Sequence, residues 1–482
     1  MARLLGIDVG TSGCKLVLID EQGRIVKQAS REYPISTPKP LWSEQNPSDW
    51  WEGVEACLAE IGEPHPDAIG VTGQMHGGVF LDSKDEVIRP AILWNDQRTV
   101  AECEEIDRVV GTERVRTTTC NPPLTGFQLP KILWLRNHEP ENFARLSSVL
   151  LPKDYIRFRL SGIKATEVSD ASGIGLLNVP KRAWSTEMME TLGLDRSLFP
   201  ECFESAVPSA RTVAVAGLDA GIPIVGGGGD QAAAAVGTGA VEPGIVSVSL
   251  GTSGVVFTAI DQPAYHRLGA AHTFCHANGA WHAMGVMLSC GGAVRWFRDT
   301  LGAGKSYDEL TGRAAMAAPG SGGTTFSPYL TGERCPHVDP YARAAFGGMT
   351  LGTTFNDICR SVFEGATFGL KEGFDLLAEL GATAGQVRVN GGGAKSEFWV
   401  QLISDVFQVS CAAPEVDEGP AFGAAILAGV GSGVWPTVQS ACREVVRLQK
   451  FWSPASFDYS AIIRRYKELY NSMASWNRTN AP

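Results

Sequence analysis

The feature that most constrains this chain is a segment that occurs twice, about half a chain apart. Residues 5–13 read Leu-Gly-Ile-Asp-Val-Gly-Thr-Ser-Gly, and an apolar run then ends in Ile19-Asp20. Residues 246–254 read Val-Ser-Val-Ser-Leu-Gly-Thr-Ser-Gly, and an apolar run then ends in Ile260-Asp261. A repeat at this spacing indicates a duplicated structural module.

Each copy has the pattern of a β-hairpin, with an apolar strand on either side of a Gly-Thr-Ser-Gly turn. Such a turn gathers amide hydrogens and hydroxyl groups on one concave side, which suits a phosphate group. We therefore predict that Gly10, Thr11 and Ser12, with the nearby Lys15, and Gly251, Thr252 and Ser253 hold the phosphates of ATP between the two halves.

The two copies differ just before the turn, where the first has Asp8 and the second has Ser249. A carboxylate beside a polyphosphate is repulsive unless a metal ion lies between them. Asp8 is therefore predicted to orient Mg²⁺ with water between, because Mg²⁺ keeps much of its hydration shell. The alternative is an aspartate that only caps its own turn.

Two further glycine clusters follow apolar runs. Gly226 to Gly229 lead into Asp230 and an alanine-rich helix, and the start of a helix favours negative charge. Asp230 could accept a proton from a hydroxyl nucleophile, or it could be an ordinary N-cap residue. The turn containing Gly392, Gly393 and Ala394 would let an adenine ring lie against the backbone.

Length and charge limit the class of protein. A chain of 482 residues exceeds one hydrophobic core, so two large domains are expected, over residues 1–241 and 242–482. The net charge of -11 argues against a nucleic-acid or anionic-membrane partner. The 11 cysteines form no C-x-x-C pair and the N-terminal apolar run is too short for a signal peptide, which predicts a cytoplasmic chain with reduced thiols.

Several short segments resemble those of a known family. They are Gly73–Gly77, Arg89–Asp96, Lys153–Tyr155, Pro328–Arg334 and Phe346–Met349. With the glycine turns, they resemble the FGGY carbohydrate kinases over nearly the whole chain, and within that family the xylulokinases most. The resemblance implies an α/β protein with the two-domain actin/hexokinase/Hsp70-like ATPase fold, in which ribonuclease H-like duplicated domains enclose an interdomain cleft.

The resemblance also implies roles for residues. Asp230 would be the catalytic base and Asp8 the carboxylate linked to Mg²⁺. Met75 and His76 would contact the sugar, although His76 could instead be structural. Further residues are expected nearby: Gln231, Trp94, Asn95 and Asp96 on the sugar side, and Gly292 and Trp296 beside the adenine, where core packing is the alternative for Trp296.

The expected reaction is transfer of the terminal phosphate of ATP to a terminal hydroxyl of a ketopentose. Glycerol kinases have Arg-Glu where this chain has Met75-His76, which favours D-xylulose as substrate and D-xylulose 5-phosphate as product. Xylulokinases commonly have Asn where this chain has Gln231, which leaves ribulose, glycerol or a sugar acid open. A different class, an Hsp70- or actin-like ATPase with a protein partner, is also open, and family habit suggests a homodimer.

Overall fold

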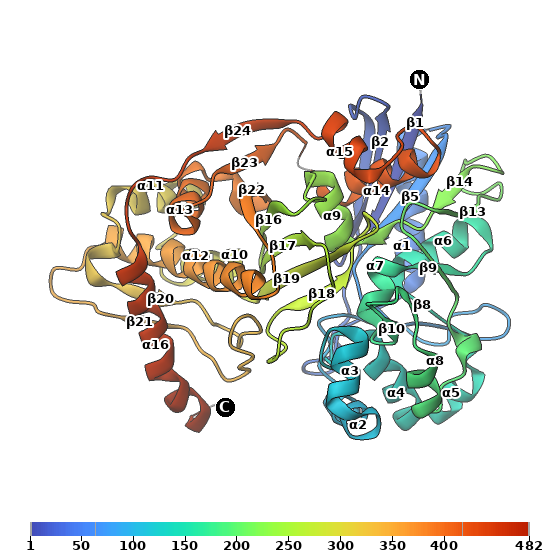
Figure 1. Ribbon diagram of the computed structural model, residues 1–482, viewed down its shortest axis with the longest axis horizontal. Helices are drawn as coiled ribbons and strands as arrows, with labels where there is room; N and C mark the ends of the chain where they lie inside the picture. Colours follow the sequence, from blue (N-terminus) through green and yellow to red (C-terminus); the bar gives the residue numbers. More distant parts are fainter. Residues whose placement is uncertain (1, 63, 417, 481–482) are drawn as a thin grey trace.

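The computed structural model describes residues 2–62, 64–416 and 418–480, and it is built on two seven-stranded sheets. The first sheet, in the right-hand lobe of Figure 1, has the order β13-β14-β5-β1-β2-β3, with β15 also paired to β5. The second has the order β18-β19-β17-β16-β22-β23-β24. The bounds of the first sheet are β1 Arg3–Val9, β2 Gly13–Asp20, β3 Ile25–Glu32, β5 Ala68–Gly73, β13 Pro208–Arg211, β14 Pro223–Val225 and β15 Gly228–Gly229. Those of the second are β16 Gly244–Leu250, β17 Gly254–Ile260, β18 His272–Cys275, β19 Trp281–Met287, β22 Ala384–Asn390, β23 Cys411–Pro414 and β24 Leu448–Trp452.

The two sheets share one pattern of pairing. In the first, β1 is antiparallel to β2 and parallel to β5, β2 is antiparallel to β3, and β5 is parallel to β14, which is antiparallel to β13. In the second, β16, β17, β19, β22, β23 and β24 repeat these directions step by step. The register places Asp8 beside Thr72 and Ser249 beside Asn390. The duplication seen in the hairpins therefore extends to the whole sheet.

Helices and short strands surround the sheets. The helices are α1 Pro47–Ile61, α2 Val100–Ile106, α3 Thr112–Thr119, α4 Gln128–His138, α5 Pro140–Arg145, α6 Pro152–Ser161, α7 Val168–Ala171, α8 Thr186–Thr191, α9 Asp230–Thr238, α10 Gly291–Thr300, α11 Tyr307–Met316, α12 Phe355–Glu379, α13 Glu397–Phe407, α14 Gly419–Gly431, α15 Val438–Val445 and α16 Ser460–Thr479. The short strands are β4 Glu44–Gln45, β6 Val79–Leu81, β7 Ala91–Ile92, β8 Ser148–Leu150, β9 Ala165–Glu167, β10 Leu177–Asn178, β11 Ala183–Trp184, β12 Glu201–Phe203, β20 Thr325–Ser327 and β21 Ala345–Gly347. Across the described ranges, no helix combines the length and apolar character that a membrane span requires.

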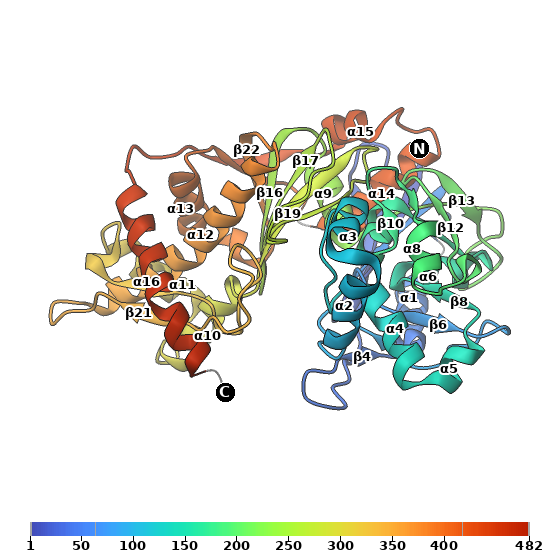
Figure 2. The same cartoon turned by 60° about the horizontal axis from the view of Figure 1, so that its bottom comes forward.

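Segments far apart in the chain cover the two faces of the first sheet. Helices α1 and α6 pack on one face, and α9, α14 and α15 pack on the other. Figures 1 and 2 both show α14 and α15, from the last quarter of the chain, in the lobe that holds β1 and β2. Glycines permit this approach, because a Cβ atom on Gly6 would lie 1.9 Å from the Ala421 carbonyl oxygen. The backbone of α14 therefore lies directly on the sheet.

Two Gly→Ala substitutions should have opposite effects on stability, because only one of the two glycines lies against a neighbouring backbone. A Cβ atom on Gly423 of α14 would lie 1.8 Å from the Ala233 carbonyl oxygen of α9, so the helices would have to separate. Gly423→Ala should lower the free energy of unfolding by about 2 kcal/mol or more, as overpacking does. Gly312, within α11, has open space around it, so Gly312→Ala should raise that free energy by about 0.5–1 kcal/mol. Urea denaturation measures both, and equal effects would contradict the direct contact of α14 with α9.

Candidate active site

The first hairpin carries Asp8 and Lys15 opposite each other on β1 and β2. Both line a cavity of about 350 Å³ with Ser249, Asn390 and Glu418, which we call the carboxylate cavity. Lys15 forms an ion pair with Glu418, the residue before α14. The Asp8 Oδ1 atom is buried and has no hydrogen-bond partner among the described residues. Burial raises the pKa of Asp8 to about 7; the nearby Asp230 acts in the same direction and Lys15 against it.

Asp230 is the first residue of α9 and follows strand β15, which pairs with the end of β5. Gly229, not Asp230, occupies the N-cap position, so the ordinary capping role is not the one observed. Burial raises the pKa of Asp230 to about 6, against hydrogen bonds from the backbone and side chain of Gln231. A carboxylate with this pKa is ionised at neutral pH and still basic enough to take up a proton.

Asp230 lines a second cavity, of about 140 Å³, which we call the His76 cavity. Its wall brings together seven of the residues predicted from sequence: Thr11, Met75, His76, Trp94, Asp230, Gln231 and Ser253. The Trp94 indole Nε1 donates to the Thr11 hydroxyl at 2.9 Å, which ties this wall to the first Gly-Thr-Ser turn. Gln231 lines both the His76 cavity and the carboxylate cavity, so the two adjoin.

His76 adopts a left-handed backbone conformation, with φ of 69°, and its ring stacks on Phe127 with ring centroids 4.8 Å apart. The ring Nδ1 lies 2.8 Å from the Gly173 carbonyl oxygen. Because a carbonyl oxygen can only accept, Nδ1 carries the hydrogen and Nε2 is left as an acceptor. Burial and the Lys131 ammonium lower the pKa of His76 to about 3, so the ring is neutral at physiological pH.

Helix α4 holds this strained turn in place. The buried Lys131 Nζ donates to the carbonyl oxygens of His76 at 2.8 Å and Gly126 at 2.7 Å, and Gln128 donates to the Gly77 carbonyl oxygen at 2.7 Å. Lys131 thereby joins two segments that wall the His76 cavity. Lys131 was not among the predicted residues, because a lysine within a helix pattern gives no local signal of such a contact.

Arg334 is a second residue that the sequence analysis did not assign to the site. It belongs to the quoted segment Pro328–Arg334, and its side chain lines the His76 cavity from the second lobe. Its guanidinium group has no hydrogen bond or ion pair with any described residue, whereas its backbone N–H donates to Glu333 and its carbonyl oxygen accepts from the Val338 N–H. The Arg334 charge acts on His76 and His272, where it contributes to their lowered pKa values. Arg334 therefore brings a positive charge to the wall of the His76 cavity.

A third cavity, of about 400 Å³, lies beyond the second Gly-Thr-Ser turn, and we call it the Trp399 cavity. Four of the predicted residues line it: Gly251, Thr252, Gly392 and Gly393. Side chains that the sequence analysis did not single out complete the wall, among them Arg295, Tyr307, Phe363 and Trp399. Strand β16 connects the cavities, because Ser249 lines the carboxylate cavity and Leu250 the Trp399 cavity.

The remaining predicted residues lie outside the three cavity walls. Gly10 and Ser12 are in the first turn itself, where the Gly10 carbonyl oxygen accepts from the Tyr33 hydroxyl. Asn95 is exposed, and the buried Asp96 forms an ion pair with Arg98. The last three are in the second lobe. The Gly292 N–H donates to the Thr252 carbonyl oxygen, Trp296 stacks on Phe326, and Ala394 packs against the hydrophobic core around the second sheet.

Comparison with known proteins identifies the family. The model of the N-terminal domain of the FGGY family of carbohydrate kinases matches residues 3–237, and the model of its C-terminal domain matches residues 246–432. A xylulose kinase of Escherichia coli is 40% identical over 437 residues, which cover 89% of this chain and 90% of that protein.

Solved structures agree with the sequence comparison. A xyloylose kinase from Brucella ovis is 34% identical, with a TM-score of 0.92 over 98% of this chain and 100% of that one. A gluconate kinase from Lactobacillus acidophilus is 25% identical, with a TM-score of 0.94 over 99% of each chain. The predicted resemblance and the predicted fold class are therefore confirmed. The chain belongs to the FGGY family of carbohydrate kinases, ATP-dependent enzymes with the two-domain actin/hexokinase-like ATPase fold.

Proposed function

We propose that this enzyme transfers the γ-phosphoryl group of ATP to the terminal hydroxyl of D-xylulose, giving D-xylulose 5-phosphate and ADP. The observation that carries the proposal is the wall of the His76 cavity, where Asp230 adjoins Thr11 and Ser253 from the two phosphate turns. The similarity to xylulose kinases supports the choice of sugar. The Trp399 cavity would take the adenosine, and the three cavities in series would line up adenosine, phosphates and acceptor.

In this proposal Asp230 accepts the proton of the sugar O5 hydroxyl as that oxygen attacks the γ-phosphorus and the bond to the bridging oxygen of ADP breaks. Phosphoryl transfer depends mostly on alignment and charge neutralisation. The glycine turns and Lys15 would hold the phosphates. Arriving phosphates would compete with Glu418 for the Lys15 ammonium.

The residues around Asp8 fit a divalent cation. Its Oδ1 atom has no partner among the described residues, and Asp8 lines a cavity together with Ser249 and Asn390, whose side chains also carry oxygen, the ligand atom that suits Mg²⁺. When bound, Mg²⁺ would neutralise charge on the transferring phosphate, with Asp8 holding it through water. No group of three or more His, Cys, Asp or Glu side chains in the described residues could hold a metal alone. Nucleotide and water would therefore supply most of the ligands.

A sugar acid is the alternative with a specific observation behind it. Arg334 brings an unpaired cation to the His76 cavity, and a gluconate kinase is among the similar structures. We favour the neutral ketose because Arg334 can equally donate to hydroxyl or keto oxygens. An enzyme of this kind would work in the cytoplasm, where ATP is available.

The substrate proposal is tested by ADP release with D-xylulose, D-ribulose, glycerol and D-gluconate. D-Xylulose should give the highest kcat/KM, and glycerol should be lower by roughly 100-fold or more, because it leaves buried polar groups of the site unpaired. A preference for D-gluconate would replace the ketose with the sugar acid. ATP hydrolysis that no sugar stimulates would favour a protein-directed ATPase.

Asp230→Asn tests the base. Turnover should fall by roughly 10²–10⁴, the usual contribution of a general base, while Asp49→Asn, in the first turn of α1, should leave it unchanged. Because the base works unprotonated and burial raises its pKa to about 6, wild-type kcat/KM for the sugar should fall as pH drops through that value, when it is measured with saturating Mg-ATP so that the cation keeps Asp8 ionised. That acid limb should disappear in the variant. A flat wild-type profile down to pH about 5 would contradict the role of Asp230.

Arg334→Met tests the contact with the sugar. Loss of a charged hydrogen bond should raise the KM for D-xylulose by roughly 10- to 100-fold and change the KM for ATP little. Arg343→Met is the matched control, because the side chain of Arg343, in the same loop, donates to no group of the described residues other than the carbonyl oxygens of Pro340 and Ala342. Equal changes for both substrates would instead indicate a structural arginine.

A further inference from the structure

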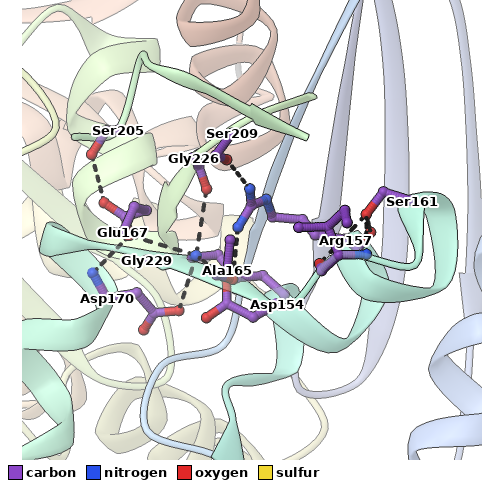
Figure 3. Close-up of polar contacts among 12 residues, drawn as sticks. Asp154, Arg157, Ser161, Ala165, Glu167, Asp170, Ser205, Ser209, Gly226 and Gly229 are labelled. Carbon is purple, nitrogen blue, oxygen red and sulfur yellow. Dashed lines mark hydrogen bonds and ion pairs between the residues drawn. The ribbon is translucent and has the colours of Figure 1, made fainter. Parts of the chain in front are cut away.

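A cluster of buried titratable side chains lies next to the tetraglycine loop that leads to Asp230 (Figure 3). Lys153, Asp154 and Arg157 come from α6, Glu167 ends β9, and Asp170 is in α7. All five are at most 1% exposed. The Lys153 Nζ lies 2.6 Å from Asp154 Oδ1, 3.6 Å from Glu167 Oε1 and 3.9 Å from Asp170 Oδ2. Burying charges costs stability even where they are paired, so this arrangement calls for a reason beyond packing.

Glu167 is the most fully bonded member of the cluster. Its carboxylate accepts from the Ser169 N–H at 2.8 Å, the Ser169 hydroxyl at 2.9 Å, the Asp170 N–H at 2.8 Å and the Ser205 hydroxyl at 2.6 Å. Four donors and the nearby Lys153 ammonium leave this carboxylate one orientation. Its fixed oxygens can therefore hold the neighbouring Ser169 and Ser205 side chains in place.

Hydrogen bonds connect the Glu167 carboxylate and its neighbours to the tetraglycine loop. The Ser169 hydroxyl that donates to Glu167 also accepts from the Gly229 N–H at 3.1 Å. The Ser205 carbonyl oxygen accepts from the Gly227 N–H at 2.8 Å, and Lys153 donates to the Gly226 carbonyl oxygen at 3.5 Å. A run of four glycines has more backbone freedom than any other sequence. These contacts restrict the backbone of the loop as far as Gly229, the residue before Asp230.

We propose that Glu167 and Ser169 are positioning residues for the catalytic base: the Glu167–Ser169–Gly229 chain of hydrogen bonds fixes the start of α9 and thereby the Asp230 carboxylate. The inference rests on the proposed role of Asp230. Neither positioning residue lines the His76 cavity, so both act without touching the sugar. Their effect should therefore appear in turnover and not in substrate binding.

Ser169→Ala is the central test, and Ser205→Ala is its matched control. Both hydroxyls donate to Glu167, but only that of Ser169 accepts from Gly229. Ser169→Ala should lower kcat by roughly 10- to 100-fold, as small misplacements of catalytic groups do, with the KM of ATP and sugar within about threefold of wild type. Ser205→Ala removes one of the four donors to Glu167 but keeps the Ser169–Gly229 bond and the backbone bond from Gly227 to residue 205, so it should retain wild-type kcat within about threefold. Equal losses in the two variants would overturn the proposal.

A double variant separates positioning from general loss of structure. If Ser169 acts through the base, Ser169→Ala should lower turnover by less than about twofold in the Asp230→Asn background, because residues that act as a unit are not additive. A loss as large as in the wild-type background would overturn the inference.

Amide hydrogen exchange of residues 226–231 tests the anchoring without sugar or ATP. Ser169→Ala should speed exchange there and Ser205→Ala should not, and unchanged exchange would contradict the inference on its own. If the wild-type enzyme phosphorylates none of the sugars tested, the proposed function fails, and the exchange measurement still decides whether Ser169 anchors the loop.

Discussion

The direct contact of the α14 backbone with the first sheet is the constraint on which the site depends. Glycines on both sides make it possible: Gly6 on β1 and Gly70 on β5 face carbonyl oxygens of α14, and Gly237 on α9 faces that of Gly419. A side chain at these positions would hold the helix away from the strands. With the helix seated, Glu418 reaches Lys15 and the start of α14 closes the cavity at Asp8. A segment from the end of the chain thus completes a site that begins at residue 8.

Burial explains the chemistry of the two carboxylates. Asp8 and Asp230 lose water on burial, and burial is the main reason that the pKa values of both are raised. For such groups the folded state binds a proton more tightly than the unfolded state, so their contribution to stability falls as pH rises toward neutrality. The fold thus gives up stability at these two positions. In return, the proposed base has a pKa close to the pH at which it works.

The sequence could predict what depends on neighbours along the chain. The two hairpins, the doubled topology and the place of Asp8 before its turn follow from local patterns, and seven predicted residues meet in the His76 cavity. Contacts between distant segments carry no such pattern. Lys131 reaches the His76 carbonyl oxygen 55 residues away, and Gly229 reaches Ser169 at a separation of 60. Periodicity reports only which side of an element is buried, so these partners could not be found from it.

Some expectations stay predictions. They concern the boundary between residues 241 and 242, the homodimer and the cytoplasmic location. The first structural unit is not formed by residues 1–241 alone, because α14 follows this boundary in the chain and packs on the first sheet. Trp296 illustrates a different limit of sequence reasoning. Its position within helix α10 is compatible with either role, and the structure stacks its ring on Phe326, outside the Trp399 cavity wall.

The polar groups of the His76 cavity also bear on the size of the sugar. Asp230 lines it together with Thr11 and Ser253 of the two Gly-Thr-Ser turns, and Arg334 lines it together with His76. Neutral His76 offers a hydrogen-bond acceptor, and Arg334 offers hydrogen-bond donors. A sugar with hydroxyl or keto oxygens along its whole length would therefore satisfy both residues and also reach Asp230. A three-carbon polyol held at Asp230 would have fewer oxygens to offer these groups and would leave more of them without a partner, and such a loss is costly. The spread of donors and acceptors therefore favours a pentulose over glycerol, even though Gln231 stands where the glycerol kinases also have glutamine.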